Sequence, residues 1–496
     1  MNRTGKNFLG VAGTIFVAKV LGFIRDIFFA FTFGTTAIND AFQTIFSVPS
    51  LLFSSIGTAL SSVNIPDLTY YLKKNDPQQR NEYIAALFAQ VTLAAAVLSL
   101  AGIILAPWIT AVLAPGLTGE INALATILCR IMMPTLLLVN ITYLATGILQ
   151  VHGHFIWSSV ISIPFNLLII ITLILADNNI IFLGYVITLG WALQFLIQCP
   201  VLVSLGYRFI GPIRLTSQLT KNLYKNVVPI ILGNSLLQLC LISDRAFSTQ
   251  LGKGAASAMS FGGNLFLTIT SIFIVAMSTV IFPGLSRFVL NKETERIKHS
   301  LNRAFQMLLF ILLPYLIAAI AYHQEIISLI YERGAFTDQS TLTTSLSFMC
   351  YSFAVFGYAC QELFNRVYYA LKNFHIPMRA SLVCLAMKLG LNIWFAQTGS
   401  LAGISLSTAF CLAVYAIILY VCLKKELGNN LIDQTFPPFI LKLMLPLSAM
   451  TAIVCLGKCH PVLAGSVAFL MPLGLSGLVY LGLSYIMGLK ELFAKH

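Results

Sequence analysis

Long apolar runs separated by short polar segments dominate the chain. Examples are FNLLIIITLILA (Phe165 to Ala176) and FQMLLFILLPYLIAAIAY (Phe305 to Tyr322). A helix of about 20 mostly apolar residues crosses the hydrocarbon of a bilayer. The pattern predicts about fourteen such helices, near residues 8–33, 38–63, 84–111, 123–150, 155–176, 180–205, 224–247, 256–283, 304–322, 340–370, 378–397, 400–423, 437–457 and 463–487.

The polar segments between these runs suggest how the helices are grouped. A basic, amphipathic segment at 206–223 reads as a cytoplasmic linker lying on the membrane surface. It divides a six-helix lobe at 1–205 from a second at 224–423, and residues 436–496 form an extra two-helix hairpin. Transporters commonly repeat a bundle and place the substrate between the copies. We therefore expect an all-α polytopic membrane protein with a central cavity.

Composition and charge support this fold class. Hydrophobic residues make up 58% of the 496 residues and charged residues 9%, against roughly 45–50% and 25% in soluble domains. The long runs also lack the short alternating pattern of a transmembrane barrel. Because cytoplasmic loops are enriched in Lys and Arg, the net charge of +13 indicates topology rather than nucleic-acid binding. An even number of spans with both termini in the cytoplasm collects most basic residues on one side.

Several charges lie where a membrane helix should have none. Lys19, Arg25 and Asp26 fall in the first predicted span, and Asp40 opens the second. A central charge costs roughly 2.5–3.5 kcal/mol on insertion scales, so such residues mark ligand sites by default. Lys19 and Asp26 share a helix face, and Lys and Arg are usual phosphate partners. The pattern predicts an anionic ligand; the alternative is that Arg25 and Asp26 pair with neighbours or snorkel to the interface.

The second half carries further charges. Glu362 and Arg366 have the spacing of an ion pair within one helix. Lys388 lies at mid-depth in its span and needs a carboxylate partner, for which Asp244 is a candidate. The alternative is that Lys388 lines water in the cavity.

The chain lacks the motifs of an enzyme. Neither GxxxxGK[ST] nor HExxH occurs, and no paired catalytic carboxylates or Ser/His/Asp arrangement stand out. Cys455, Cys459 and His460 cluster at one helix end but provide too few ligands for a metal. We expect a secondary transporter or flippase for something anionic, with no cofactor and no nucleic-acid partner.

Several motifs resemble the MurJ/MviN family of lipid II flippases, within the superfamily of multidrug, oligosaccharidyl-lipid and polysaccharide exporters. The similar segments are AKVLGFIRDIFFAFTFGTTAINDAFQTIFSVPSLL (Ala18 to Leu52), SDRAFSTQLGKGAASAMSFGGNL (Ser243 to Leu265), VIFPGLSRF (Val280 to Phe288), YERGAFTDQST (Tyr331 to Thr341) and the stretch from Phe364 to Phe410.

The resemblance implies a function and roles for residues. A flippase of this kind moves the undecaprenyl-pyrophosphate-linked peptidoglycan precursor, lipid II, from the inner to the outer leaflet of a bacterial cytoplasmic membrane by alternating access. Lys19, Arg25, Asp26 and Asp40 match family positions that would bind and gate around the pyrophosphate and its sugars. The last two spans would form a groove for the polyprenyl tail. We expect such a protein to act as a monomer among membrane lipids.

The sequence also departs from the family pattern. Asn264 stands where an arginine is common, so some cationic contacts are lost. Some family members hold sodium between a seventh-span aspartate and the eleventh span; Lys388 and Asn392 occupy the corresponding positions. We hypothesise that Lys388 pairs with Asp244 as a tethered cation and that transport is independent of sodium, driven by membrane potential or protons. Two alternatives stay open: a flippase for another polyprenyl-linked oligosaccharide, and a small-molecule antiporter of the same superfamily.

Overall fold

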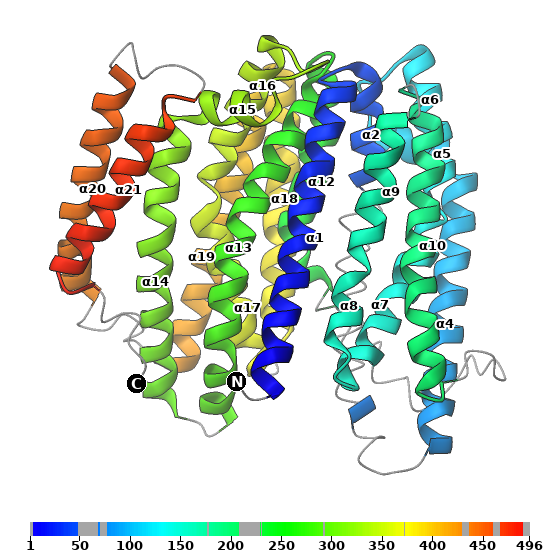
Figure 1. Cartoon of the computed structure of the whole chain (residues 1–496), viewed down its shortest axis with the longest axis horizontal. Helices are drawn as coiled ribbons and strands as arrows, with labels where there is room; N and C mark the ends of the chain where they lie inside the picture. The colour runs from blue at the N-terminus through cyan, green and yellow to red at the C-terminus, as the bar shows by residue number, and fades with distance from the viewer. Residues whose placement is uncertain are drawn as a thin grey trace. The chain divides into compact units, whose positions relative to one another are not determined.

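The protein consists of helices joined by short turns in the parts that its computed structural model describes, namely residues 3–47, 68–69, 77–175, 178–207, 229, 231–290, 293–371, 373–428, 436–459 and 467–489 (Figure 1). Within these ranges no β-strand occurs. The contacts divide the chain into two compact units. Unit 1 is Met1–Ser257 with Arg333–Phe336, and unit 2 is Ala258–Glu332 with Thr337–His496.

The bundle of unit 1 brings together helices that lie far apart along the chain. Helix α1 lies against α8 and α9, and α10 lies between α7 and α9. The elements of this unit are α1 (Arg3–Phe33), α2 (Ala37–Ser47), α4 (Pro77–Ile104), α5 (Ala106–Leu113), α6 (Gly119–Met132), α7 (Thr135–Val151), α8 (Phe155–Val160), α9 (Ser162–Leu175), α10 (Ile180–Ser204), α12 (Leu236–Ser248) and the 3₁₀ turn η2 (Thr249–Leu251).

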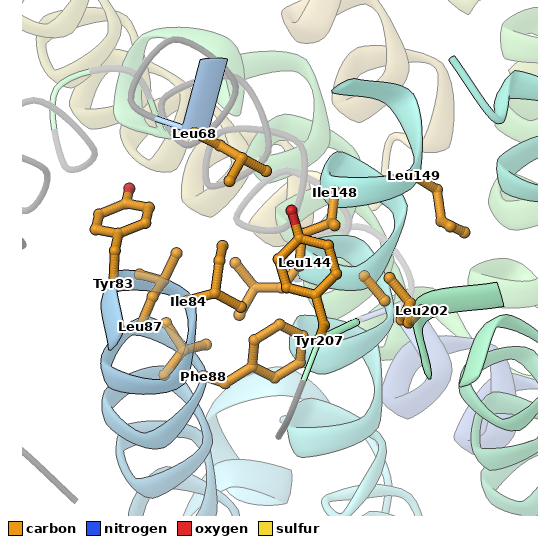
Figure 2. Packing of buried hydrophobic residues seen from close by; sticks show 12 residues of the cluster. Leu68, Tyr83, Ile84, Leu87, Phe88, Leu144, Ile148, Leu149, Leu202 and Tyr207 are labelled. Carbon is orange, nitrogen blue, oxygen red and sulfur yellow. The ribbon is translucent and has the colours of Figure 1, made fainter. Parts of the chain in front are cut away.

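Unit 1 contains a buried cluster of aromatic and aliphatic side chains. Ile84 and Phe88 of α4 lie toward Leu144 of α7 and Leu202 of α10, with the buried ring of Tyr207 among them (Figure 2). Apolar surface gains little from leaving lipid for protein, so close van der Waals packing of this kind holds membrane helices together.

Unit 2 contains most of α13 and the helices that follow it. Helix α19 packs against α16, α17 and α18, and α14 packs against α20. The elements are α13 (Ala255–Leu290), α14 (Thr294–Ala321), α15 (His323–Tyr331), α16 (Asp338–Ser352), α17 (Val355–Ala370), α18 (His375–Gln397), α19 (Leu401–Leu427), α20 (Phe436–Cys459) and α21 (Leu470–Ile486).

A missing side chain sets the distance between two helices of unit 2. A Cβ atom on Gly357 of α17 would come within 2.6 Å of the Leu412 side chain on α19. The glycine therefore lets the two backbones approach closely, as small residues do between membrane helices.

The all-helical membrane fold predicted from the sequence is confirmed. In the described part of the chain, nine helices are long and apolar enough to cross a bilayer, so the total of fourteen stays a prediction. The linker at 206–223 and the later part of the second span fall almost wholly outside the described residues. The lobe boundaries also stay a prediction; the contact-based division places α12 in unit 1.

Several predicted spans differ from the helices of the structure, and two of them show why. The ninth span was predicted to begin near residue 304, but α14 begins at Thr294, because the polar segment before it is helical too. The tenth, 340–370, is two helices, α16 and α17, which are separated at Phe353 and Ala354. Hydropathy detects apolar length, so it extends no helix into polar sequence and finds no break inside an apolar run.

Candidate substrate-binding and ion sites

A charged pair lies within α1 of unit 1. The Nε and Nη2 atoms of Arg25 donate to Oδ1 of Asp26 over 3.1 and 2.8 Å. The Nη1 atom donates to Oδ1 of Asn166 on α9, over 3.1 Å. The two charged side chains are 19% and 14% exposed. A guanidinium has five N–H groups, so these three bonds leave two of them for a ligand.

The side chain of Asn166 fixes the direction of the Arg25 guanidinium. Its amide nitrogen donates to the Ser162 carbonyl over 2.8 Å, one turn earlier on α9, and only 4% of the residue is exposed. The amide oxygen therefore points at Arg25. Sequence reasoning missed Asn166, although a lone asparagine inside the run FNLLIIITLILA could have revealed it.

Lys19 lies on α1, two turns before Asp26. Its side chain is exposed, and the prediction that it faces a hydrated cavity stays a prediction. The predicted binding role of Lys19 stays a prediction.

Asp40 is buried and holds a helix start. It is 1% exposed, and its Oδ2 accepts the backbone N–H of Gly254 over 2.6 Å. Its Oδ1 accepts the N–H and the hydroxyl of Ser257, each over 2.7 Å. A carboxylate at this place satisfies unpaired N–H groups and complements the positive end of the α13 dipole.

Gly254 makes this cap sterically feasible. It has a φ of +86°, and a Cβ atom there would lie 2.5 Å from the Thr35 carbonyl oxygen. The turn before α2 and the turn before α13 are therefore in close contact. The sequence singled out Asp40 for its charge but did not reveal Ser257 as its partner.

Lys388 occupies a sealed position in unit 2. It is 0% exposed, and its Nζ donates to the Ile404 carbonyl over 2.9 Å and to the Ser407 hydroxyl over 2.5 Å. The Ser407 oxygen in turn lies 2.9 Å from Oδ1 of Asn392, which is also 0% exposed. The structure thus brings the predicted pair Lys388 and Asn392 to one cluster and adds Ser407, which sequence reasoning missed among many buried serines.

The remaining predicted residues of the second half are divided between the two units. Asp244 is fully buried on α12 and belongs to unit 1, so its pairing with Lys388 of unit 2 stays a prediction. Asn264 is half-buried on α13. The predicted Glu362–Arg366 ion pair is confirmed, with Nη2 and Oε2 at 3.8 Å.

Comparison with known proteins places these sites in a family. The family model described as "Lipid II flippase MurJ" matches residues 29–475. The chain belongs to the MurJ family. A lipid II flippase MurJ of Burkholderia cenocepacia is 24% identical over 430 residues, covering 84% of this chain and 83% of that protein. A "probable lipid II flippase MurJ" of Buchnera aphidicola is 26% identical over 422 residues, covering 84% and 82%.

Solved structures show the same fold. A lipid II flippase MurJ in an inward closed conformation superposes with a TM-score of 0.82 at 22% identity, covering 98% of this chain and 99% of that one. An inward-facing multidrug transporter of the wider superfamily gives a TM-score of 0.65 at 12% identity, covering 83% and 94%. The resemblance to MurJ inferred from sequence motifs is therefore confirmed at the level of the family.

Proposed function

We propose that this chain is a lipid II flippase of the bacterial cytoplasmic membrane, acting as a single chain with both termini in the cytoplasm. The observation that carries the proposal is the half-buried Arg25 guanidinium, oriented by Asp26 and Asn166 and left with two N–H groups. Arginine matches the geometry of phosphate oxygens, and such charge-assisted hydrogen bonds are roughly twice as strong as neutral ones. Membership of the MurJ family supports lipid II as the diphosphate substrate.

The proposed transport cycle uses this pair as the headgroup contact. The substrate's diphosphate binds the free N–H groups of Arg25, while Asp26 keeps the guanidinium in place. Lys19, on the same helix, adds a second positive charge. The polyprenyl tail stays in lipid throughout, so only the polar headgroup needs a wet path through the protein. Alternating access then delivers the headgroup to the outer leaflet.

The test is a headgroup-accessibility assay on the purified chain in vesicles, comparing lipid II with other polyprenyl-pyrophosphate glycans. Because a hydrogen bond to a charged group contributes about 1.5–3 kcal/mol, Arg25→Ala should slow lipid II flipping by roughly 10- to 100-fold. Arg130→Ala, which removes an exposed arginine of α6, is the matched control. Equal flipping by the two variants would contradict the proposal, and faster flipping of another glycan would reassign the substrate.

We also propose that transport does not depend on sodium. The groups around Lys388 are oxygens of a carbonyl, a hydroxyl and an amide, which are the ligands that hard cations take. They do not suit an added sodium ion, because the Lys388 side chain already occupies their centre as a three-donor ammonium. Membrane potential or protons then remain as the driving force.

Sodium dependence can be measured at fixed membrane potential by replacing external sodium with choline. The wild-type flipping rate should not change. Lys388→Asn removes the ammonium from the oxygen cluster. This variant should lose flipping activity in choline and recover it where external sodium can occupy the oxygens. Wild-type flipping that rises with external sodium would refute this part of the proposal while leaving the lipid II assignment intact.

A further inference from the structure

Unit 2 contains an apolar groove that the proposed headgroup site does not use. It has a volume of about 280 Å³ and lies between α14, α17 and α19, where α20 begins. Its walls are mostly aromatic and aliphatic side chains, among them Leu301, Phe305, Phe364, Ile417, Tyr420 and Phe436. This volume is near the lower end of small-ligand pockets, roughly 300–1,000 Å³, so the groove suits part of one hydrocarbon chain.

Two lysines stand at one end of this groove. Lys298 precedes the lining residue Leu301 by three positions on α14, and Lys424 follows Tyr420 by four on α19, so each continues a lining face by one turn. The Lys298 Nζ lies near the end of α19, because a Cβ atom on Gly428 would be 3.8 Å from it. The start of α14 and the end of α19 therefore place two positive charges at the same end of the groove.

The negative charge nearby does not cancel this pair. Lys298 Nζ contacts Oε1 of Glu295 over 2.9 Å; the Lys298 side chain is 13% exposed and the Glu295 side chain 87% exposed. Because the carboxylate is open to solvent, water screens this pair, and it stabilises the protein less than a fully buried pair would. An anion that binds Lys298 can therefore displace the Glu295 carboxylate into solvent.

We propose that this groove binds an anionic phospholipid, with one acyl chain against the aromatic walls and its phosphate between Lys298 and Lys424. Basic pockets at the cytoplasmic ends of membrane helices are typical sites for anionic headgroups. The lysines match the negative phosphate of such a lipid, and the apolar groove beside them matches its acyl chain. This binding is independent of the Arg25 site, and it would tie α14 to α19.

The test is native mass spectrometry of the full purified chain, titrated with phosphatidylglycerol or with phosphatidylethanolamine of the same acyl chains. Wild type should retain phosphatidylglycerol more tightly. Lysines near a membrane surface contribute about 1 kcal/mol each, so the double variant Lys298→Gln, Lys424→Gln should lose about fivefold in affinity for each lysine. Lys425→Gln is the matched control, because that lysine lies about 100° around α19 from Lys424.

A second variant tests the groove itself. Ala416→Trp places a large ring in the space and should remove the bound lipid. The rim variants leave the apolar walls of the groove unchanged, so they test the proposal without altering its shape. Phosphatidylglycerol should also raise the unfolding temperature of wild type but not of the double variant, since a ligand stabilises only the state it binds. Three results would overturn the proposal: equal binding of the two lipids to wild type, unchanged affinity of the double variant, or preferential filling of the groove by a polyprenyl phosphate.

Discussion

Asp26 and Asp40 are two carboxylates of the same unit that the structure uses in different ways. Asp26 lies beside an arginine that keeps N–H groups to spare, and its side chain is 14% exposed. Asp40 is 1% exposed and accepts three hydrogen bonds at the start of α13. The sequence made both carboxylates equal candidates for substrate binding. The comparison teaches that the donors around a buried charge, more than the charge itself, indicate whether it serves the fold or a ligand.

The largest expected effect comes from removing the buried carboxylate. Asp40→Ala leaves the N–H groups of Gly254 and Ser257 without their acceptor in a buried place. Each buried donor left without an acceptor costs about 1–3 kcal/mol, so the loss of two N–H partners should lower the free energy of unfolding by about 2–6 kcal/mol. Chemical denaturation of the purified chain in detergent measures the change.

Asp26→Ala is the control for this substitution. Arg25 keeps its bond to Asn166 and is partly exposed, so the loss of stability should be near 1 kcal/mol. Equal destabilisation by the two variants would remove the distinction between the sealed and the open carboxylate.

A smaller effect on flipping should follow when Arg25 is kept but the contact that orients its guanidinium is removed. Asn166→Leu deletes the contact that orients the guanidinium, so Arg25 keeps its charge but loses its direction. Lipid II flipping should fall by about 3- to 10-fold, which is the value of one hydrogen bond near 1 kcal/mol. The fall should appear mainly in the apparent affinity for lipid II, measured from the concentration dependence of the flipping rate.

Asn140→Leu provides the comparison for Asn166→Leu. Asn140 on α7 is also buried and also donates to a carbonyl one turn earlier, over 2.8 Å. A similar loss of flipping in this variant would mean that Asn166 acts through helix stability alone, and not by positioning Arg25.

Much of this arrangement could be predicted from the sequence, and the rest could not, for physical reasons. Apolar runs longer than the bilayer is thick define membrane helices, so the fold class followed from hydropathy alone. The cost of intramembrane charge drew attention to Arg25, Asp26 and Lys388. Their partners, Asn166 and Ser407, are polar residues of ordinary type whose importance depends on which helices touch. That information is tertiary, and a single sequence does not contain it.

The smallest effect concerns a polar contact that can change its charge. His152, just after α7, lies with Nε2 2.7 Å from the hydroxyl of Tyr207. Burial, with the positive charges of Arg80 and His154 as further causes, lowers the pKa of His152 below its ordinary value near 6.5. The neutral ring is therefore favoured in the folded protein, and its contribution to stability is complete above about pH 6.5 and is lost as the pH falls below it.

The lowered pKa of His152 predicts how stability changes with pH. Like Asp26 and unlike the sealed Asp40, His152 is partly buried. The wild-type unfolding temperature should fall between pH 7.5 and 5.5 by more than that of His152→Gln, which has no proton to gain. His375→Gln, at an exposed position of α18, should keep the wild-type slope. If the slope of His152→Gln equalled that of wild type, protonation of the ring would not be opposed by its surroundings, and Tyr207 would be held by the apolar cluster of Figure 2 alone.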